Sequence, residues 1–204
     1  MTDLSSNNGA VNIAAYSRSG HAVIAIKATQ GRHYVNPFHL SQCQEAHRLG
    51  LTVIHYHYCS LGNVAEEIAH FRNTYLRGWR KGDYCCFDLE IPGLNIGSYA
   101  RELLGTFFRK TGHPPILYTY KSYAEEHLKG IKVPGGGRWW IAKYSNGAPL
   151  IPKGQVLFAW QYTDGQAGPE PHAFPGIGKA DGSIVNVGVA SRLWVRKLRT
   201  RRKR

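Results

Sequence analysis

The chain has 204 residues, 43% of them hydrophobic, and a formal net charge of +13. This length and apolar content suffice for one domain with a sizeable core. No run approaches the ~18 apolar residues of a membrane-spanning helix, and the N-terminus lacks the basic start and apolar run of a secretory signal, so we expect synthesis in a cytoplasm without a standard signal peptide.

Short apolar runs alternate with helix-like stretches along the first 130 residues. Strands are predicted near Asp3 and over 22–29, 51–58, 83–90 and 114–120. Helices are predicted over 37–50, 63–78, 97–112 and 121–130, and the first three of these end at a glycine that suits a C-terminal cap. Strands that alternate with helices of ~10–15 residues indicate βαβ units and a parallel sheet.

After residue 130 the rhythm changes, because Gly/Pro-rich loops leave no room for long helices. Strands are predicted over 138–144, 156–162 and 183–187, followed by a short helix over 190–198. The count of about eight strands predicts a single α/β domain, an irregular TIM-like barrel whose second half has lost most of its helices. A doubly wound sheet is the alternative, but no GxGxxG turn supports it.

The predicted strands run from apolar to polar and aromatic residues in the same direction. Their ends carry Lys27, Gln30, His55, Tyr56, His57, Tyr58, Asp88, Glu90, Tyr118, Tyr120, Lys143, Tyr144, Gln161 and Tyr162. Catalytic groups of parallel barrels lie at the carboxyl ends of the strands. Strand ends are also wetter than strand middles, but wetness alone does not explain the excess of Trp, Tyr and Gln. The pattern therefore predicts a site at this end of the barrel.

The stretch YCCFDLE (84–90) places two carboxylates directly after a buried run. Asp88 and Glu90 are two residues apart on a predicted strand, so their side chains share a face with backbones about 6.6 Å apart. At that range each disfavours the ionisation of the other, which raises one pKa and provides a general acid. Glycosidases typically use a pair of carboxyl groups whose pKa values differ. The aromatic residues at the strand ends could pack against the apolar faces of a sugar.

Other constellations carry less weight. His55 and His57 share a face and could bind a metal, but no third ligand with recognisable spacing follows and HExxH is absent. GGGR (135–138) reads as a loop, and no GxSxG elbow is present. We therefore expect no metal and no cofactor in the reaction.

The four cysteines, Cys43, Cys59, Cys85 and Cys86, form no CxxC, and the vicinal pair is a poor disulfide. We predict reduced thiols in the core.

The positive charge is concentrated in VRKLRTRRKR (195–204), which holds seven of the 26 basic residues and no acidic residue. Without this basic tail the net charge falls by seven, from +13 to +6. Such a tail is either solvated and non-specific, or it attracts the protein to a polyanion such as a bacterial cell wall or nucleic acid.

The chain resembles the glycoside hydrolase family 25 lysozymes, the Chalaropsis-type muramidases common among bacteriophage lysins. The resemblance covers nearly all of the chain before the basic tail. It rests on the order and spacing of DLSSNNG (3–9), IKATQGRHYVNP (26–37), AHRLGLTVIHYHY (46–58), FDLE (87–90), ILYTY (116–120), WWIAKY (139–144) and WQYTDG (160–165).

The resemblance implies a (β/α)5β3 barrel over 1–194 that cleaves the β-1,4 bond between N-acetylmuramic acid and N-acetylglucosamine in peptidoglycan without a metal. It implies that Glu90 is the general acid and that Asp88 positions the substrate's acetamido group or stabilises an oxocarbenium-like state. Asp3 would be the acidic residue of the first strand. The expected substrate-binding residues are Tyr58, Tyr118, Lys27, Trp160 and Gln161.

The family also has a late-strand Asp, followed about eleven residues later by a helical Leu. Asp181 stands twelve residues before Leu193, and Asn186 stands seven before it, so the spacing favours Asp181. If Asn186 were the equivalent, the site would lack one charge.

The leading hypothesis is a muramidase, a phage endolysin made in the host cytoplasm that acts at the bacterial cell wall as a monomer. The alternative is a non-catalytic module on the same barrel that binds cell-wall glycan. The basic tail would attract anionic wall polymers. Nucleic acid is suggested by the tail alone, since no nucleic-acid-binding motif accompanies it.

Overall fold

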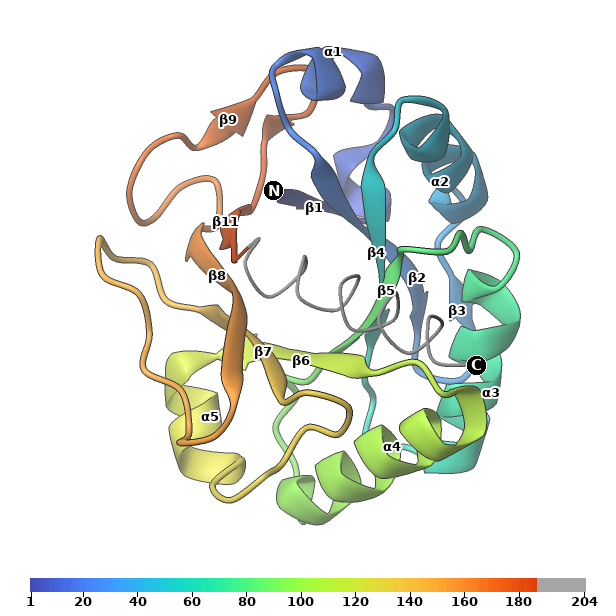
Figure 1. The fold of residues 1–204 in the computed structure, drawn as a ribbon, viewed down its shortest axis with the longest axis vertical. Coiled ribbons are helices and arrows are strands. Elements are labelled where there is room, and N and C mark those ends of the chain that lie inside the picture. Colours follow the sequence, from blue (N-terminus) through green and yellow to red (C-terminus); the bar gives the residue numbers. More distant parts are fainter. Residues whose placement is uncertain (187–204) are drawn as a thin grey trace, which may run out of the picture.

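The computed structural model describes residues 1–186, which form a closed barrel with helices packed along part of its outer side (Figure 1). β1 pairs with β2 on one side and with β11 on the other, and these two pairings close the barrel. Its eight strands, in chain order, are β1 (Thr2–Leu4), β2 (Val23–Gln30), β4 (Thr52–Tyr58), β5 (Tyr84–Asp88), β6 (Pro115–Tyr120), β7 (Arg138–Ala142), β8 (Val156–Thr163) and β11 (Gly182–Val185).

Helices follow only the first five of these strands among the described residues. They are α1 (Ile13–Arg18), α2 (His39–Arg48), α3 (Val64–Tyr75), α4 (Ile96–Thr111) and α5 (Lys121–His127). Neighbouring strands from β1 to β8 run parallel, whereas β11 is antiparallel to both β8 and β1. The prediction of an irregular (β/α)5β3 barrel is therefore confirmed. The helix predicted over 190–198 and the basic tail lie outside the described residues.

Several short elements had no counterpart in the sequence-based prediction. They are the 3-10 helix η1 (Ser6–Asn8), α1, strand β3 (Tyr34–Val35) beside β2, and the hairpin β9 (Ala173–Phe174) with β10 (Gly178–Lys179). Each is too short to show periodicity, and the first two depend on side-chain caps. The Ser5 hydroxyl accepts from Asn7 N–H at 3.2 Å, and the Asn12 side chain accepts from Ala15 N–H at 2.9 Å.

The structure of strand β5 explains the nearly continuous apolar run at 84–87 of the sequence. Cys86 packs in the cluster that fills the barrel interior, whereas Cys85, Phe87 and Leu89 pack outward against the surrounding helices. A strand covered on both faces needs apolar residues at every position. All four cysteines are buried and free, as expected for core thiols.

No helix among the described residues has the length and apolar character needed to span a bilayer.

Candidate active site

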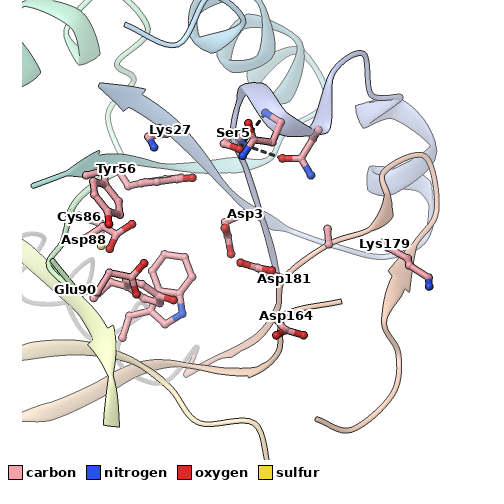
Figure 2. Close-up of a pocket in the computed structure, with 16 residues that line it drawn as sticks. Asp3, Ser5, Lys27, Tyr56, Cys86, Asp88, Glu90, Asp164, Lys179 and Asp181 are labelled. Atoms are coloured by element: carbon pink, nitrogen blue, oxygen red, sulfur yellow. Dashed lines mark hydrogen bonds between the residues drawn. The ribbon is translucent and has the colours of Figure 1, made fainter. Parts of the chain in front are cut away.

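A cleft of about 330 Å³ lies at the rim of the barrel where β1, β4 and β5 end (Figure 2). Carboxylates from both ends of the chain and from its middle converge on it. The lining residues are Asp3, Ser5, Asn7, Asn8, Lys27, Tyr56, Tyr58, Cys86, Asp88, Glu90, Tyr118, Trp140, Asp164, Lys179, Ala180 and Asp181. Seven of the nine residues predicted from sequence are in this set, and Trp160 and Gln161 are not.

Glu90 lies just beyond a strand that was predicted to include it. β5 ends at Asp88, but the backbone remains tied to its neighbours: Cys59 N–H donates to Asp88 O at 2.9 Å, and Leu89 N–H donates to Tyr118 O at 3.0 Å. The alternation of side chains therefore continues past the strand. Leu89 is fully buried on the outer side, and both Asp88 and Glu90 line the cleft.

Asp3 and Asp181 are brought to the cleft by pairing between the two ends of the barrel. The Met1 ammonium donates to Ser183 O at 2.8 Å, and the Thr2 hydroxyl donates to Asp181 O at 2.7 Å. Asn186, the other candidate for the late-strand position, lies just after β11 with its N–H bonded to Phe158 O and is not part of the cleft lining within residues 1–186. The structure thus brings Asp181 to the other three carboxylates.

The four carboxyl groups disfavour each other's ionisation. Burial first, and then the nearby charges, raise the pKa of Asp3 and Asp88 well above the ordinary value and also raise the pKa of Glu90 and Asp181. The charge that acts on Asp181 is that of Asp164, a fifth carboxylate in the cleft lining. Lys27 opposes this for Asp88 and Glu90 by lowering their pKa values. Protons are therefore held at this rim at pH values where exposed carboxyl groups are ionised.

Removing one carboxylate charge from the cleft should stabilise the fold. Asp88 has one carboxylate oxygen, Oδ1, without a hydrogen-bond partner among the described residues, and its pKa is raised by burial and by Glu90. A raised pKa means that stability increases as pH falls through the folded-state value and is lower at neutral pH. We expect Asp88→Asn to raise the free energy of unfolding at pH 7 by about 0.5–2 kcal/mol while lowering activity. Thermal melts at pH 7 and pH 4 measure this, and an equal change at both pH values would contradict it.

Lys27 is placed among aromatic rings as well as carboxylates. Its Nζ lies 4.8 Å from the centroid of the Tyr58 ring and donates to Gln30 Oε1 at 2.8 Å. Burial lowers the pKa of Lys27, against the pull of Asp88 and Glu90. With Lys27, Lys179 and several aromatic faces beside its acids, the cleft has a combination that suits the hydroxyl groups and apolar faces of sugars.

Trp160 and Gln161 lie outside the cleft lining. Gln161 Oε1 accepts from the Tyr118 hydroxyl at 2.5 Å, and Trp160 Nε1 donates to Lys143 O at 2.7 Å. The Gln161 amide lies near enough to lower the pKa of Asp181 without reaching hydrogen-bond geometry. Gln161 therefore supports a residue of the cleft lining, whereas the bond of Trp160 is made to a residue outside it.

Sequence reasoning missed several lining residues. Trp140 could have been found from strand alternation, because it points inward on β7, and Tyr56 was noted only as one of several strand-end residues without a role in the site. The lining groups of η1 and of the β9–β10 hairpin come from short irregular segments, which give no periodic signal. They are Ser5, Asn7, Asn8 and Lys179.

Comparisons with known proteins agree with this geometry. The model of the glycosyl hydrolases family 25 matches residues 2–170. The autolytic lysozyme of Clostridium acetobutylicum is 29% identical over 167 residues, which cover 79% of this chain and 49% of that protein. The chain thus spans about half the length of this relative.

Solved structures share the fold. A lysozyme from Streptomyces coelicolor superposes with a TM-score of 0.75 at 17% identity, covering 93% of this chain and 94% of that one. The catalytic domain of an endolysin from a bacteriophage of Listeria monocytogenes gives a TM-score of 0.73 at 19% identity, with 94% and 95% covered.

An eight-stranded barrel with acids clustered at its rim is an architecture found among glycoside hydrolases. The chain belongs to the glycosyl hydrolases family 25.

Proposed function

We propose that this protein is a muramidase that hydrolyses the β-1,4 bond between N-acetylmuramic acid and N-acetylglucosamine in peptidoglycan. The observation that carries the proposal is the convergence of Asp3, Asp88, Glu90 and Asp181 in one cleft with raised pKa values. Membership of family 25 and the likeness to lysozymes support it.

Glu90 is the proton donor in this proposal. It is half-buried, its pKa is raised by burial and by Asp181, and it is the more accessible member of the Asp88–Glu90 pair. Its carboxyl proton passes to the glycosidic oxygen as the bond from that oxygen to the sugar's C1 breaks. A water molecule then adds at C1 and returns a proton to Glu90.

Asp88 assists at the sugar that becomes positively charged. It lies deeper in the cleft than Glu90, and Lys27 favours its ionised form. A carboxylate in that place stabilises an oxocarbenium-like state or positions the substrate's acetamido group. The negative charge of Asp181 helps Glu90 to retain its proton, and Asp3 completes the group of acids around it. Tyr58, Tyr118 and Lys27 contact the sugars. Trp160 and Gln161 stabilise the neighbouring part of the barrel.

We further propose that the protein is a bacteriophage endolysin, active as a monomer on the bacterial cell wall after synthesis in the host cytoplasm. The likeness in fold to a phage endolysin catalytic domain supports this assignment. The basic tail would draw the enzyme to anionic wall polymers, an attraction that added salt weakens.

The test is the appearance of new reducing ends when the protein is incubated with purified peptidoglycan. Release of reducing ends supports hydrolysis. Tight binding of the glycan without release would instead support the second candidate, a non-catalytic glycan-binding module, which the aromatic wall of the cleft could also serve.

A further inference from the structure

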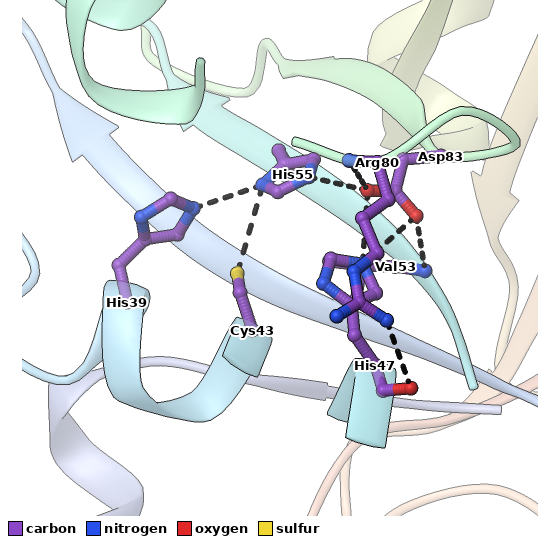
Figure 3. A network of polar contacts seen from close by, with 7 residues as sticks. All are labelled: His39, Cys43, His47, Val53, His55, Arg80 and Asp83. Atoms are coloured by element: carbon purple, nitrogen blue, oxygen red, sulfur yellow. Dashed lines mark hydrogen bonds and ion pairs between the residues drawn. The ribbon is translucent and has the colours of Figure 1, made fainter. Parts of the chain in front are cut away.

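A group of buried metal-ligating side chains lies outside the barrel wall, between β4 and α2 (Figure 3). His39 and Cys43 stand one turn apart on α2, and His55 points toward them from β4. One ligand atom from each of the three residues lies within 4.8 Å of the others, and all three side chains are at most 2% exposed. The sequence pattern had drawn attention to His55 beside His57, whereas the partners of His55 precede it in the chain.

Two groups compete for one ring nitrogen of His55. His39 Nε2 lies 2.9 Å from His55 Nδ1, and Cys43 Sγ lies 3.7 Å from the same atom. A neutral imidazole nitrogen has a single lone pair, so it accepts one hydrogen bond well. His39 Nε2, Cys43 Sγ and His55 Nδ1 thus converge inside the core, and a metal ion placed between them could bind all three.

Asp83 fixes which nitrogen of His55 is free. Its carboxylate accepts from the backbone N–H groups of Val53 at 3.1 Å and Arg80 at 2.7 Å, and these contacts favour the ionised form. His55 Nε2 lies 3.2 Å from Asp83 Oδ2 and is therefore the protonated nitrogen. This leaves the Nδ1 lone pair directed at His39 and Cys43. A carboxylate behind a ligating histidine is the usual outer partner of a protein-bound zinc ion.

We propose that His39 Nε2, Cys43 Sγ and His55 Nδ1 bind a single zinc ion. Tetrahedral zinc with ordinary bond lengths separates two nitrogen ligands by about 3.4 Å and a nitrogen from a sulfur by about 3.6 Å. The distance of 3.7 Å between His55 Nδ1 and Cys43 Sγ already fits. His39 Nε2 and His55 Nδ1, now 2.9 Å apart, need to separate by about half an ångström.

Binding is balanced in protons and charge. The Cys43 thiol loses its proton to solvent, and His39 shifts its ring proton from Nε2 to Nδ1. The charge of the zinc dication is then offset by the Cys43 thiolate and by the Asp83 carboxylate, which His47 Nε2 also contacts at 3.0 Å, and this lowers the penalty of a buried charge. Gly78 packs closely against this group, since a Cβ there would stand 3.1 Å from Cys43 Cβ and 3.4 Å from His39 Cε1.

The neighbouring group His57, Cys59 and Glu67 lacks this character. Glu67 already accepts from His57 Nε2 at 2.9 Å, from Ser60 and from Gly62 N–H, and the other His57 nitrogen contacts the Thr29 hydroxyl at 2.8 Å. Both Glu67 oxygens and both His57 ring nitrogens thus already have separate protein partners, and no ring nitrogen is shared by two groups as His55 Nδ1 is. It therefore serves as an internal comparison rather than as a second site.

The test is a titration of the reduced, chelator-stripped, untagged chain with Co²⁺, followed by Zn²⁺. Co²⁺ should give a thiolate-to-metal charge-transfer band that Zn²⁺ abolishes, with one proton released per ion. At a hundredfold excess of free zinc over its Kd, the melting temperature should rise by about 5 °C or more. Mg²⁺ should do neither.

Two variants separate the site from cysteine chemistry in general. Cys43→Ala, or Cys43→Ser if the first does not fold, should lose the band, the proton release and the thermal shift. Cys86→Ala removes an equally buried thiol from the inner face of β5 and should keep all three. The absence of a band in the parent chain, or a band retained without Cys43, would overturn the proposal.

Discussion

Replacing Glu90 by glutamine is expected to lower the rate of peptidoglycan hydrolysis by at least ~10²-fold, the smaller end of the contribution that general acids make. Glutamine keeps the size of the side chain but has no acidic proton to give to the leaving oxygen. Because the pKa of Glu90 is raised in the cleft, the activity of the parent enzyme should also fall as pH rises through that pKa. Turbidity loss of wall suspensions across a pH series measures both effects.

Glu126→Gln is the matched control for this substitution. Glu126 lies on α5 with its side chain 73% exposed and outside the cleft lining, so its loss should leave hydrolysis unchanged. Binding of Glu90→Gln to insoluble wall should persist, because the aromatic wall is intact. Full lytic activity in Glu90→Gln would refute the assignment of Glu90 as the proton donor.

Replacing Glu67 by glutamine is expected to destabilise the fold by about 3 kcal/mol at pH 7. Glu67 is fully buried, and although burial favours its neutral form, contacts with His57, Ser60 and Gly62 lower its pKa from 4.5 to about 2. A depressed pKa contributes stability above the unfolded-state value near 4.5, and that contribution is lost as pH falls toward 2. Glutamine also turns an amide N–H₂ toward backbone donors that need an acceptor.

Chemical denaturation of Glu67→Gln and of Glu66→Gln at pH 7 and pH 3 provides the comparison. Glu66 is the adjacent residue, 55% exposed and paired with Arg32, and its substitution should change stability by less than about 0.5 kcal/mol. The deficit of Glu67→Gln should shrink on acidification. A deficit of the same size at both pH values would show that packing, rather than charge, sets the effect.

The contribution of Glu67 connects stability with the site. It binds the loop that follows β4 through Ser60 and Gly62, and β4 ends at Tyr58, whose ring borders the cleft and contacts Lys27. Loss of this carboxylate should therefore loosen one wall of the cleft as well as weaken the fold.

The barrel was predictable from sequence because its determinants are local. Strand β5 carries apolar residues on both faces and acids at its end, and this pattern alone indicated a parallel strand that presents Asp88 and Glu90. The later strands were recognised from short apolar runs between Gly/Pro-rich loops. Their register was not recognisable, because it depends on pairings such as Met1 with Ser183 across the whole chain.

Long-range contacts explain the remaining differences. The spacing to Leu193 only favoured Asp181 over Asn186, whereas the pairing of β1 with β11 brings Asp181 beside Asp3. His55 looked like a strand-end residue, but alternation turns it outward to His39 and Cys43 on a helix that precedes it. Neither contact has a signature in local sequence.

The identity of the sugar at the reducing ends released from purified peptidoglycan tests the central claim most directly. Borohydride reduction followed by acid hydrolysis converts only the terminal sugar to its alditol, which chromatography identifies. Our account predicts muramicitol from the parent enzyme and no excess over background from Glu90→Gln. Glucosaminitol in its place would mean that the other glycan bond is cut and would contradict the account.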